Sequence, residues 1–259
     1  QRPSQVVYDR SHSAIAETDP EAYDWQTLLA GADWFHISGI TPALSENAKE
    51  ATVTACREAN ALGLTVSCDL NYRGKLWNWD PSQARRQLAK ETMAEILPDV
   101  DVLIGNEGDA EDMLGIRAGK SDVEKGKLEV DRYAEVARQI SERFKNLRSI
   151  AFTLRESLSA THNRWGAMLY DVATDEAHFA PHNERGYSPY EITDIVDRVG
   201  AGDSFSGALV YALREATMQN SPDTVVGFAT AASALCHSIH GDFNFVTKDE
   251  VLALMGGDM

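Results

Sequence analysis

The stretch from Asp194 to Ala216 reads DIVDRVGAGDSFSGALVYALREA, and it decides how the rest of the sequence is interpreted. The small residues Gly200, Ala201 and Gly202 lead directly into a helical pattern over residues 202–215, whose apolar side chains fall on one face. Glycines allow consecutive backbone N–H groups to point into one concavity, and the start of a helix adds partial positive charge. The stretch therefore predicts a hole for an anion at the start of this helix.

Asp203 lies in the first turn of the predicted helix, where a carboxylate has two interpretations. It stabilises the helix dipole in many proteins, whatever their function. It can also be a base that takes a proton from a hydroxyl group while neighbouring amides hold a transferred phosphoryl group. The local sequence alone leaves both interpretations open.

The surrounding chain alternates between strand and helix patterns. We expect strands at 5–8, 34–38, 64–69, 100–105, 149–153, 165–169, 177–180 and 194–196, and helices at 45–61, 77–97, 109–114, 130–144, 202–215, 223–238 and 249–255. This order predicts an α/β fold with a mostly parallel central sheet and helices on both faces. Ligands of such sheets bind beyond the carboxyl ends of the strands.

Composition excludes several classes of protein. The chain has 259 residues with 43% hydrophobic and 25% charged residues, which is typical of a soluble globular protein. A net charge of −16 disfavours a nucleic-acid partner. Neither a membrane span nor a secretory signal is found, and the three cysteines form no CxxC pair, so we expect buried thiols in a cytoplasmic protein.

Two polar segments follow predicted strands. Asp69, Asn71 and Arg73 alternate along an extended stretch and are expected to share one face, where Arg73 can bind a carboxylate or phosphate. Glu107 and Asp109 fall at the predicted start of a short helix, directly after another strand. A solvated loop with an internal Asp–Arg pair and an ordinary polar helix start are the alternatives that remain open.

The segment Asp197 to Asp203 resembles the C-terminal motif of the ribokinase-like (PfkB) carbohydrate kinases, which usually reads Asp-Thr-x-Gly-Ala-Gly-Asp. Arg198 and Val199 depart from the commonest pair and resemble the 2-keto-3-deoxygluconate kinase branch. The resemblance implies a ribokinase-like fold with the remnant of a small β lid. It also implies that ATP phosphorylates the terminal hydroxyl of 2-keto-3-deoxygluconate, with Asp203 as the base and Gly200, Ala201 and Gly202 as the anion hole.

Further segments agree with this branch, and the resemblance implies a role for each. The residues implied to bind the sugar acid are Tyr8, Arg10, Asp69, Arg73 and Asp242. Those implied to bind ATP are Asn71, Asn106, Thr153, Arg155 and Asn244. Mg²⁺ is implied to be held through water by Asp109, which stands where the family has Glu, or by Glu107.

The resemblance extends over the whole chain and implies one kinase domain over residues 1–259, with 1–12 as a strand of the lid. Family members carry about 80–90 further N-terminal residues, so the chain is expected to be a fragment or incompletely described at its start. A homo-oligomer is possible, and no membrane partner is expected. Two alternatives stay open: a kinase of the same family for another sugar such as ribose or fructose, and a non-catalytic sugar- or nucleotide-binding relative.

Overall fold

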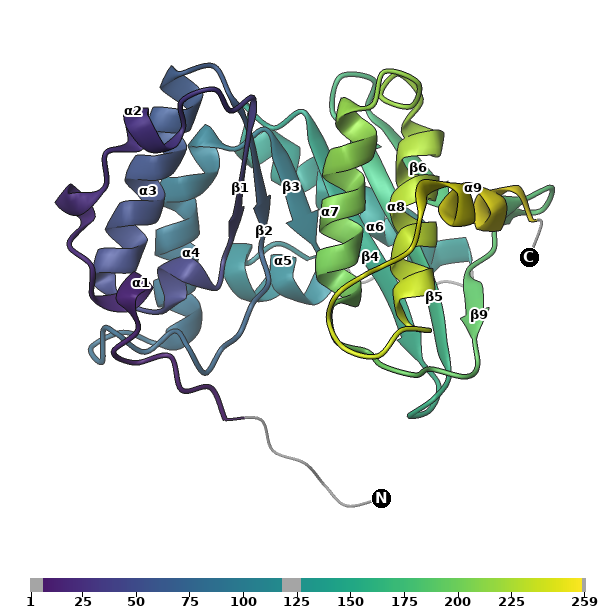
Figure 1. The fold of residues 1–259 in the computed structure, drawn as a ribbon, viewed down its shortest axis with the longest axis horizontal. Helices are drawn as coiled ribbons and strands as arrows, with labels where there is room; N and C mark the ends of the chain where they lie inside the picture. Colours follow the sequence, from purple (N-terminus) through teal and green to yellow (C-terminus); the bar gives the residue numbers. More distant parts are fainter. Residues whose placement is uncertain (1–6, 118–126, 258–259) are drawn as a thin grey trace. The chain divides into compact units, whose positions relative to one another are not determined.

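A computed structural model describes residues 7–117 and 127–257 (Figure 1). The chain divides into two units, each of which is described by itself. The first unit comprises Gln1–Gly119 and Gln139–Leu147, and the second comprises Lys120–Arg138 and Arg148–Met259. The predicted single domain over 1–259 stays a prediction.

The described part of the first unit is built on three parallel strands. They are β1 (Trp34–Ser38), β2 (Thr65–Asp69) and β3 (Val102–Gly105), and β2 pairs with both of the others. All four residues of β3 are buried, as expected for a strand of a parallel sheet. The predicted strands at 34–38, 64–69 and 100–105 are confirmed, and their parallel order agrees with the α/β prediction.

The helix between β1 and β2 begins where the sequence predicted. α3 (Glu46–Ala61) is capped by Ser45, whose side chain accepts a hydrogen bond from the Ala48 amide at 3.0 Å. It packs against β1, β2 and α4 (Arg85–Ile96), and Figure 1 shows α3 and α4 side by side. The other elements of the first unit are α1 (Ala14–Glu17), η1 (Pro20–Ala22), α2 (Trp25–Leu28), η2 (Thr41–Ala43), η3 (Leu97–Asp99) and α5 (Glu107–Leu114).

Two expectations for this unit were wrong. The helix predicted over 77–97 begins only at Arg85, because the Asp80 carboxylate accepts bonds from the amide and the hydroxyl of Ser82 and closes a turn there. Val7–Arg10 forms no strand, because no described strand pairs with it. Residues 1–6 of the predicted lid strand lie outside the described residues.

The second unit contains an antiparallel sheet. β4 (Ser149–Ser157) pairs with β5 (Asn163–Asp171), which also pairs with β6 (Glu176–Ala180) and β9 (Tyr190–Ile192). β7 (His182–Asn183) and β8 (Gly186–Tyr187) form a separate hairpin. A strand was predicted at 194–196, and this was wrong, because the strand lies at β9 and the Val196 amide instead donates to the His237 carbonyl at 2.9 Å.

The other described elements of the second unit are helices. α8 (Pro222–Cys236) packs against β5 and β6, while α7 (Ala201–Arg214) and α9 (Lys248–Gly256) pack against α8 (Figure 1). α6 (Lys127–Arg143) contributes its residues up to Arg138 to this unit. The predicted helices at 202–215, 223–238 and 249–255 are confirmed within two residues at each end.

The cysteines Cys56, Cys68 and Cys236 are free thiols and buried, as predicted. Within residues 7–117 and 127–257, no helix has the length and apolar character needed to cross a membrane.

Candidate active site

The start of α7 has the geometry of an anion hole. Gly200 is the N-cap residue with a φ of 81°, and no side chain caps the helix. The first intrahelical bond runs from the Ser204 amide to the Gly200 carbonyl at 2.7 Å. The amides of Ala201, Gly202 and Asp203 precede that bond, so they face the space beyond the helix start. Three N–H donors and the helix dipole therefore favour an anion there.

Two features of the structure require glycine at position 200. Its positive φ lies in the left-handed region that L residues with a Cβ rarely adopt. A Cβ on Gly200 would also lie 2.3 Å from the carbonyl oxygen of Asp242. The backbone of residues 241–243 thus passes directly over the start of α7, as only glycine allows.

Asp203 lies in the first turn of α7 with an exposed side chain. Among the described residues, its carboxylate accepts no hydrogen bond and forms no ion pair. Both carboxylate oxygens are therefore available to a substrate hydroxyl, beside the three amides of the anion hole. The structure thus places the predicted base and the predicted anion hole on one helix start.

Asp197 braces the glycine segment from its N-terminal side. Its carboxylate accepts bonds from the amides of Arg198 at 2.7 Å, Val199 at 3.1 Å and Gly241 at 3.1 Å. These amides, the one of Val199 first, hold the pKa of Asp197 below its usual range. The sequence analysis assigned this residue no role of its own, although three charge-assisted bonds fix the loop around it.

Asn244 anchors the segment that follows α8. Its amide nitrogen donates to the Ser204 hydroxyl at 2.6 Å and to the Ala232 carbonyl at 3.0 Å, and its amide oxygen accepts from the Val246 amide at 3.1 Å. The side chain therefore fastens residues 241–247 to α7 and α8. Its predicted contact with ATP stays a prediction.

The Asp242 side chain, by contrast, forms no hydrogen bond or ion pair with the described residues. Its side chain is exposed, and only its backbone carbonyl approaches Gly200. The residue lies beside the start of α7, and its predicted contact with the sugar acid stays a prediction.

Thr153 and Arg155 lie on β4, and the side chain of Arg155 is exposed. His237 is buried nearby, 4.9 Å from the ring of Trp165, and burial, followed by smaller effects that include the positive charges of Arg155 and Arg198, lowers its pKa. The backbone carbonyl of His237 accepts from the amides of Val196 at 2.9 Å and Asp197 at 3.3 Å, so this residue lies next to the start of the glycine segment. Binding of ATP by Thr153 and Arg155 stays a prediction.

In the first unit, polar side chains gather after β2 and β3. Asn71 has a φ of 41°, so the chain turns there and does not continue as an extended stretch. The turn is stabilised by the Asp69 carboxylate, which accepts from the Asn71 amide at 3.2 Å. The expectation that Asp69, Asn71 and Arg73 alternate along one extended face was therefore wrong. Arg73 is exposed, and one of its guanidinium nitrogens donates to the Tyr72 carbonyl at 3.1 Å.

Asp109 connects the loops that follow β2 and β3. One carboxylate oxygen accepts from the Tyr72 amide at 3.2 Å, and the other accepts from the Asn106 side chain at 2.7 Å. Asn106 in turn caps α5, since its side-chain oxygen accepts from the Asp109 amide at 2.9 Å. Burial raises the pKa of Asp109 to about 6. The buried carboxylate of Asp109 therefore links the two loops through hydrogen bonds.

Of the two predicted magnesium residues, Asp109 fits a direct ligand poorly, because each of its oxygens is already bonded. Glu107 is half-buried in the first turn of α5. Within the described ranges, no group of three or more His, Cys, Asp or Glu side chains is arranged to hold a metal ion. Contact of these residues with Mg²⁺ through water stays a prediction.

Tyr8 and Arg10 lie at the start of the described chain, outside any strand, with Tyr8 half-buried and Arg10 exposed. The alternation that was expected to place them on one face of a strand is absent from these residues. Their contact with a sugar acid stays a prediction.

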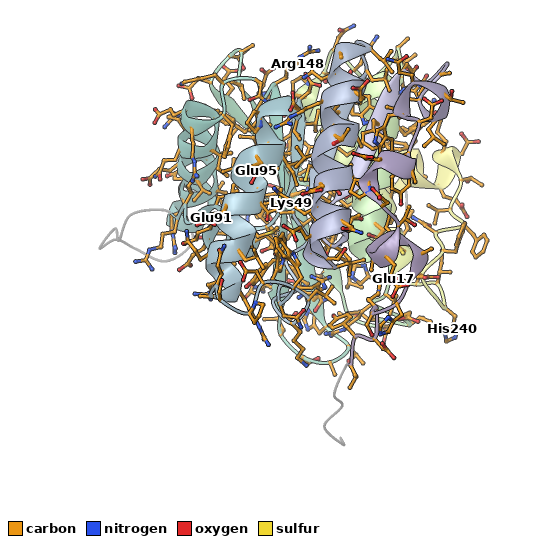
Figure 2. All side chains as sticks on the ribbon, turned by 90° about the vertical axis from the view of Figure 1, so that its left-hand side faces the viewer. Glu17, Lys49, Glu91, Glu95, Arg148 and His240 are labelled. Carbon is orange, nitrogen blue, oxygen red and sulfur yellow. The ribbon has the colours of Figure 1, made fainter. Side chains whose placement is uncertain are left out.

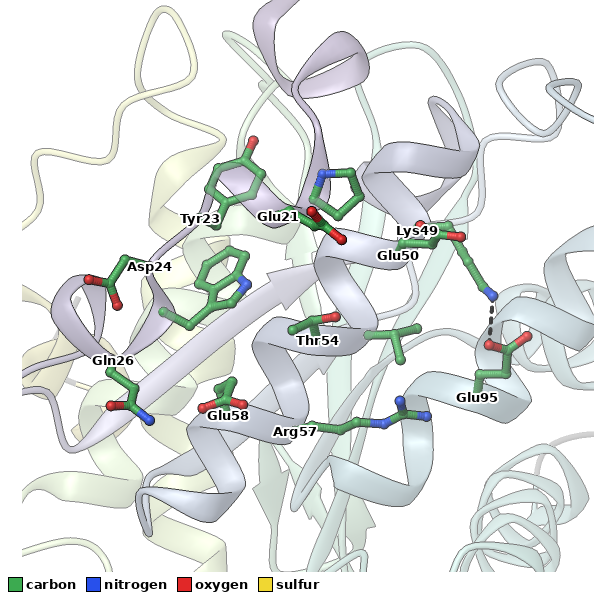
Figure 3. Close-up of a pocket in the computed structure, with 13 residues that line it drawn as sticks. Glu21, Tyr23, Asp24, Gln26, Lys49, Glu50, Thr54, Arg57, Glu58 and Glu95 are labelled. Carbon is green, nitrogen blue, oxygen red and sulfur yellow. Dashed lines mark hydrogen bonds and ion pairs between the residues drawn. The ribbon is translucent and has the colours of Figure 1, made fainter.

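A hollow of about 590 Å³ lies elsewhere in the first unit, between α3 and the segment of η1 and α2 (Figure 3). Lys49 of α3 and Glu95 of α4 form a 2.6 Å ion pair at its edge, and Figure 2 shows the two residues close together. The lining carries more acidic than basic side chains and includes none of the predicted site residues. The hollow is therefore separate from the candidate site.

Comparison with known proteins identifies similar chains. The family model described as pfkB family carbohydrate kinase matches residues 2–248. A 2-dehydro-3-deoxygalactonokinase of Haloferax volcanii is 34% identical over 99% of this chain and 68% of its own length. A 2-dehydro-3-deoxygluconokinase of Thermoproteus tenax is 26% identical over 92% of this chain and 59% of its own length. The crystal structure of a 2-dehydro-3-deoxygluconokinase from Thermotoga maritima is similar with a TM-score of 0.83 and 43% identity, over 99% of this chain and 71% of that one.

Proposed function

Because the chain belongs to the pfkB family of carbohydrate kinases, we propose that it transfers the γ-phosphoryl group of ATP to the terminal hydroxyl of 2-keto-3-deoxygluconate. The predicted ribokinase-like α/β fold and the predicted class of enzyme, an ATP-dependent sugar kinase, are confirmed by the same similarities. The observation that carries the mechanism is the exposed carboxylate of Asp203 beside three uncapped amides at the start of α7.

In the proposed reaction, the Asp203 carboxylate accepts the proton of the substrate hydroxyl as that oxygen forms its bond to the γ-phosphorus. The bond between this phosphorus and the bridging oxygen of ADP breaks in the same transfer. The amides of Ala201, Gly202 and Asp203 donate to the negative oxygens of the moving phosphoryl group. Fixed donors of this kind stabilise a charge as it develops, which is the main contribution that a protein makes to phosphoryl transfer.

Magnesium neutralises phosphate charge when it is bound with ATP, and we propose that it is bound together with the nucleotide. Glu107 is the better placed of the two predicted carboxylates to contact it through water, since Asp109 is buried and bonded on both oxygens. No step of the transfer is assigned to either residue.

Recognition of an acidic sugar is proposed to depend on Arg73 and Arg10, with Tyr8, Asp69 and Asp242 bonding its hydroxyl and keto groups. The exposed guanidinium groups of Arg73 and Arg10 favour this role, because a bidentate arginine binds a carboxylate well. Asn71, Asn106, Thr153, Arg155 and Asn244 are the residues proposed to surround ATP. A carbohydrate kinase draws on cellular ATP, so we propose the cytoplasm as its location.

A second substrate is favoured by one of the similar proteins, whose name specifies 2-dehydro-3-deoxygalactonate as the sugar acid. The two sugar acids share the carboxylate, the keto group and the terminal hydroxyl, so the same arginines and the same base would serve either. Structures described as fructokinases are only 19% identical to this chain and support the fold alone.

The proposal is tested by measuring ADP release with a panel of 2-keto-3-deoxygluconate, 2-keto-3-deoxygalactonate, ribose and fructose. The full-length protein should turn over a keto-deoxy sugar acid with a kcat/KM at least tenfold above that for the neutral sugars. Preference for ribose or fructose would overturn the substrate proposal but leave the family intact.

The base is tested by Asp203→Asn, which should lower kcat by about 100-fold or more while ATP binding by calorimetry changes little. The matched control is Asp223→Asn, since Asp223 occupies the first turn of α8 and bonds His178 at 2.9 Å. That variant should retain normal turnover. Normal turnover by Asp203→Asn would refute the assignment, and ATP binding without turnover in the wild-type protein would favour a non-catalytic relative.

A further inference from the structure

The side chain of Arg198 connects the glycine segment to a turn far away in the sequence. One guanidinium nitrogen donates to the carbonyl of Ser159 at 2.7 Å and also to the carbonyl of Ala160. These carbonyls lie 39 and 38 residues earlier in the chain, in the turn between β4 and β5. We propose that Arg198 is a positioning residue, which fixes the anion hole of α7 by fastening its N-terminal approach to this turn.

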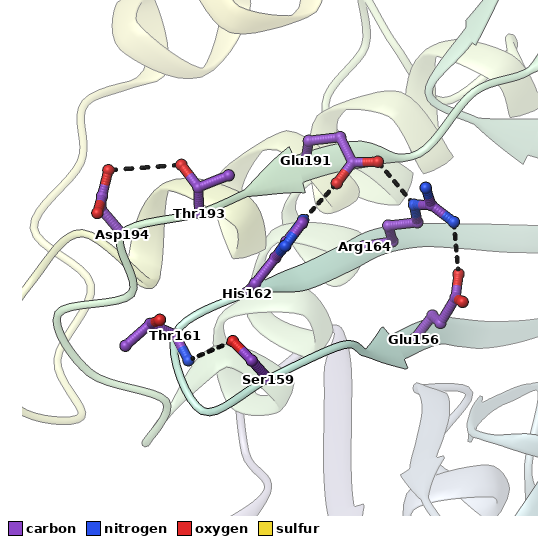
Figure 4. Close-up of polar contacts among 8 residues, drawn as sticks. All are labelled: Glu156, Ser159, Thr161, His162, Arg164, Glu191, Thr193 and Asp194. Carbon is purple, nitrogen blue, oxygen red and sulfur yellow. Dashed lines mark hydrogen bonds and ion pairs between the residues drawn. The ribbon is translucent and has the colours of Figure 1, made fainter.

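The turn is well suited as an anchor because it is braced from within. The amides of Leu158 and Ser159 both donate to the His162 carbonyl, at 3.0 and 3.1 Å. The Thr161 amide donates to the Ser159 hydroxyl at 3.2 Å (Figure 4). Each bond crosses the turn within five residues, so the carbonyls that accept from Arg198 have little freedom to move.

The strands beside the turn are tied together by a row of charged side chains. Figure 4 shows Arg164 of β5 between Glu191 of β9 and Glu156 of β4, with bonds of 2.6 and 3.2 Å. His162 contacts the second oxygen of the same Glu191 carboxylate. β9 leads directly into the segment that carries Arg198, so this row aligns the start of that segment with the turn.

The glycine segment is also held on its other side. Asp197 accepts from the Gly241 amide at 3.1 Å, and the Val196 amide donates to the His237 carbonyl at 2.9 Å. Adjacent side chains therefore hold the segment from two directions: Asp197 toward the residues after α8, and Arg198 toward the β4–β5 turn. Removing Arg198 leaves the bonds of Asp197 in place but releases the other side of the segment, so the anion-hole amides three to five positions further along are held less firmly.

The chemistry of the contact explains an arginine at this position. A guanidinium group is planar, always charged and weakly hydrated, so it can bridge two neighbouring carbonyls from one fixed position. A lysine offers the charge without the planar geometry, and the threonine usual at this position in the family has neither. Because the guanidinium group of Arg198 donates to these carbonyls, it is not directed at a substrate carboxylate. The residue should consequently affect the rate of transfer and not the binding of the sugar.

The inference rests on the role proposed above for the start of α7, and its test uses whichever sugar the wild-type protein phosphorylates best. Misplacing catalytic amides by about 1 Å costs on the order of 100-fold in rate. Arg198→Ala should therefore lower kcat by roughly 10- to 100-fold, with less than a threefold change in KM for the sugar. Arg198→Lys should recover a part of the loss. Added guanidinium chloride at millimolar concentration should raise the turnover of Arg198→Ala, while sodium chloride at the same ionic strength should not.

Arg138→Ala is the matched control, because Arg138 is an exposed arginine whose 2.8 Å ion pair with Asp175 lies at the other end of β5. It should leave both kcat and KM unchanged. If the alanine protein does not fold, Arg198→Gln, which keeps a neutral donor, replaces it with the same expected loss in kcat.

A folded Arg198→Ala protein with a kcat within twofold of wild type would overturn the inference. So would a tenfold higher KM for the sugar at unchanged kcat, because that result would make Arg198 a ligand of the substrate. Failure of the wild-type protein to phosphorylate any sugar would contradict the proposed function itself. A loss of kcat in Arg198→Ala that neither Arg198→Lys nor guanidinium restores would overturn the positioning role and make Arg198 a structural residue only.

Discussion

Gly200→Ala is the substitution for which the structure predicts the clearest result. Gly200 has a φ of 81°, and a Cβ built on it would lie 2.3 Å from the carbonyl oxygen and 2.9 Å from the carbonyl carbon of Asp242. Both contacts are with backbone, so no side chain can rotate away. Either residues 241–243 or the start of α7 must move.

The size of the effect follows from these two features. A left-handed conformation costs a residue with a Cβ roughly 1–2 kcal/mol. Ordinary contact begins near 3.4 Å, so the Asp242 oxygen must retreat by about 1 Å, and overpacking of this kind costs about 1–3 kcal/mol. The sum is about 2–5 kcal/mol, which corresponds to a fall in melting temperature of roughly 5–15 °C for a chain of this size. The same displacement of the amides should lower kcat by about 100-fold.

Thermal unfolding and the ADP-release assay together test this reasoning. The control is Gly207→Ala on the same helix, where a Cβ meets nothing within 4 Å and φ is not positive. Alanine in a helix interior is worth roughly 0.5–1 kcal/mol over glycine, so this variant should be slightly more stable and fully active. A Gly200→Ala protein that melts within 1 °C of wild type and retains its turnover would refute the close approach of Asp242 to α7.

Two further predictions concern residues whose bonds the structure defines. Since burial raises the pKa of Asp109 from 3.8 to about 6, the folded protein binds that proton more tightly, and this group lowers the free energy of unfolding by up to about 3 kcal/mol as pH rises from about 4 to about 6. Urea unfolding between pH 4 and pH 6 should show a smaller fall in the free energy of unfolding for Asp109→Asn than for wild type. Equal falls in the two proteins would contradict the raised pKa of a buried Asp109. Asn244→Ala removes bonds to Ser204 and Ala232 and should cost about 1–3 kcal/mol of stability and lower kcat. A raised KM for ATP at unchanged stability would instead make Asn244 a ligand of the nucleotide.

The elements that the sequence predicted well are those with strong local signals. The Ser45 cap fixed the start of α3, and the glycine segment fixed the start of α7, because capping and dipole effects act over a few neighbouring residues. Predictions failed where a hydrogen bond that the hydrophobic pattern does not reveal decides the backbone, whether its partner is near or far in the sequence. The chain turns at Asn71 because the Asp69 carboxylate accepts a hydrogen bond from the Asn71 amide. Residues 194–196 do not form a strand because the Val196 amide donates to the His237 carbonyl.

Arg198 shows the same limit inside the catalytic motif. From the sequence, its departure from the usual threonine indicated a branch of the family and hence an acidic substrate. In the structure, the side chain bonds two main-chain carbonyls of the β4–β5 turn, and a carbonyl acceptor has no signature in the sequence because every residue carries one. A residue whose identity indicates a substrate class can thus influence the reaction by fixing the position of main-chain atoms. The two interpretations of Arg198 differ in a measurable quantity, since a substrate ligand changes KM and a positioning residue changes kcat.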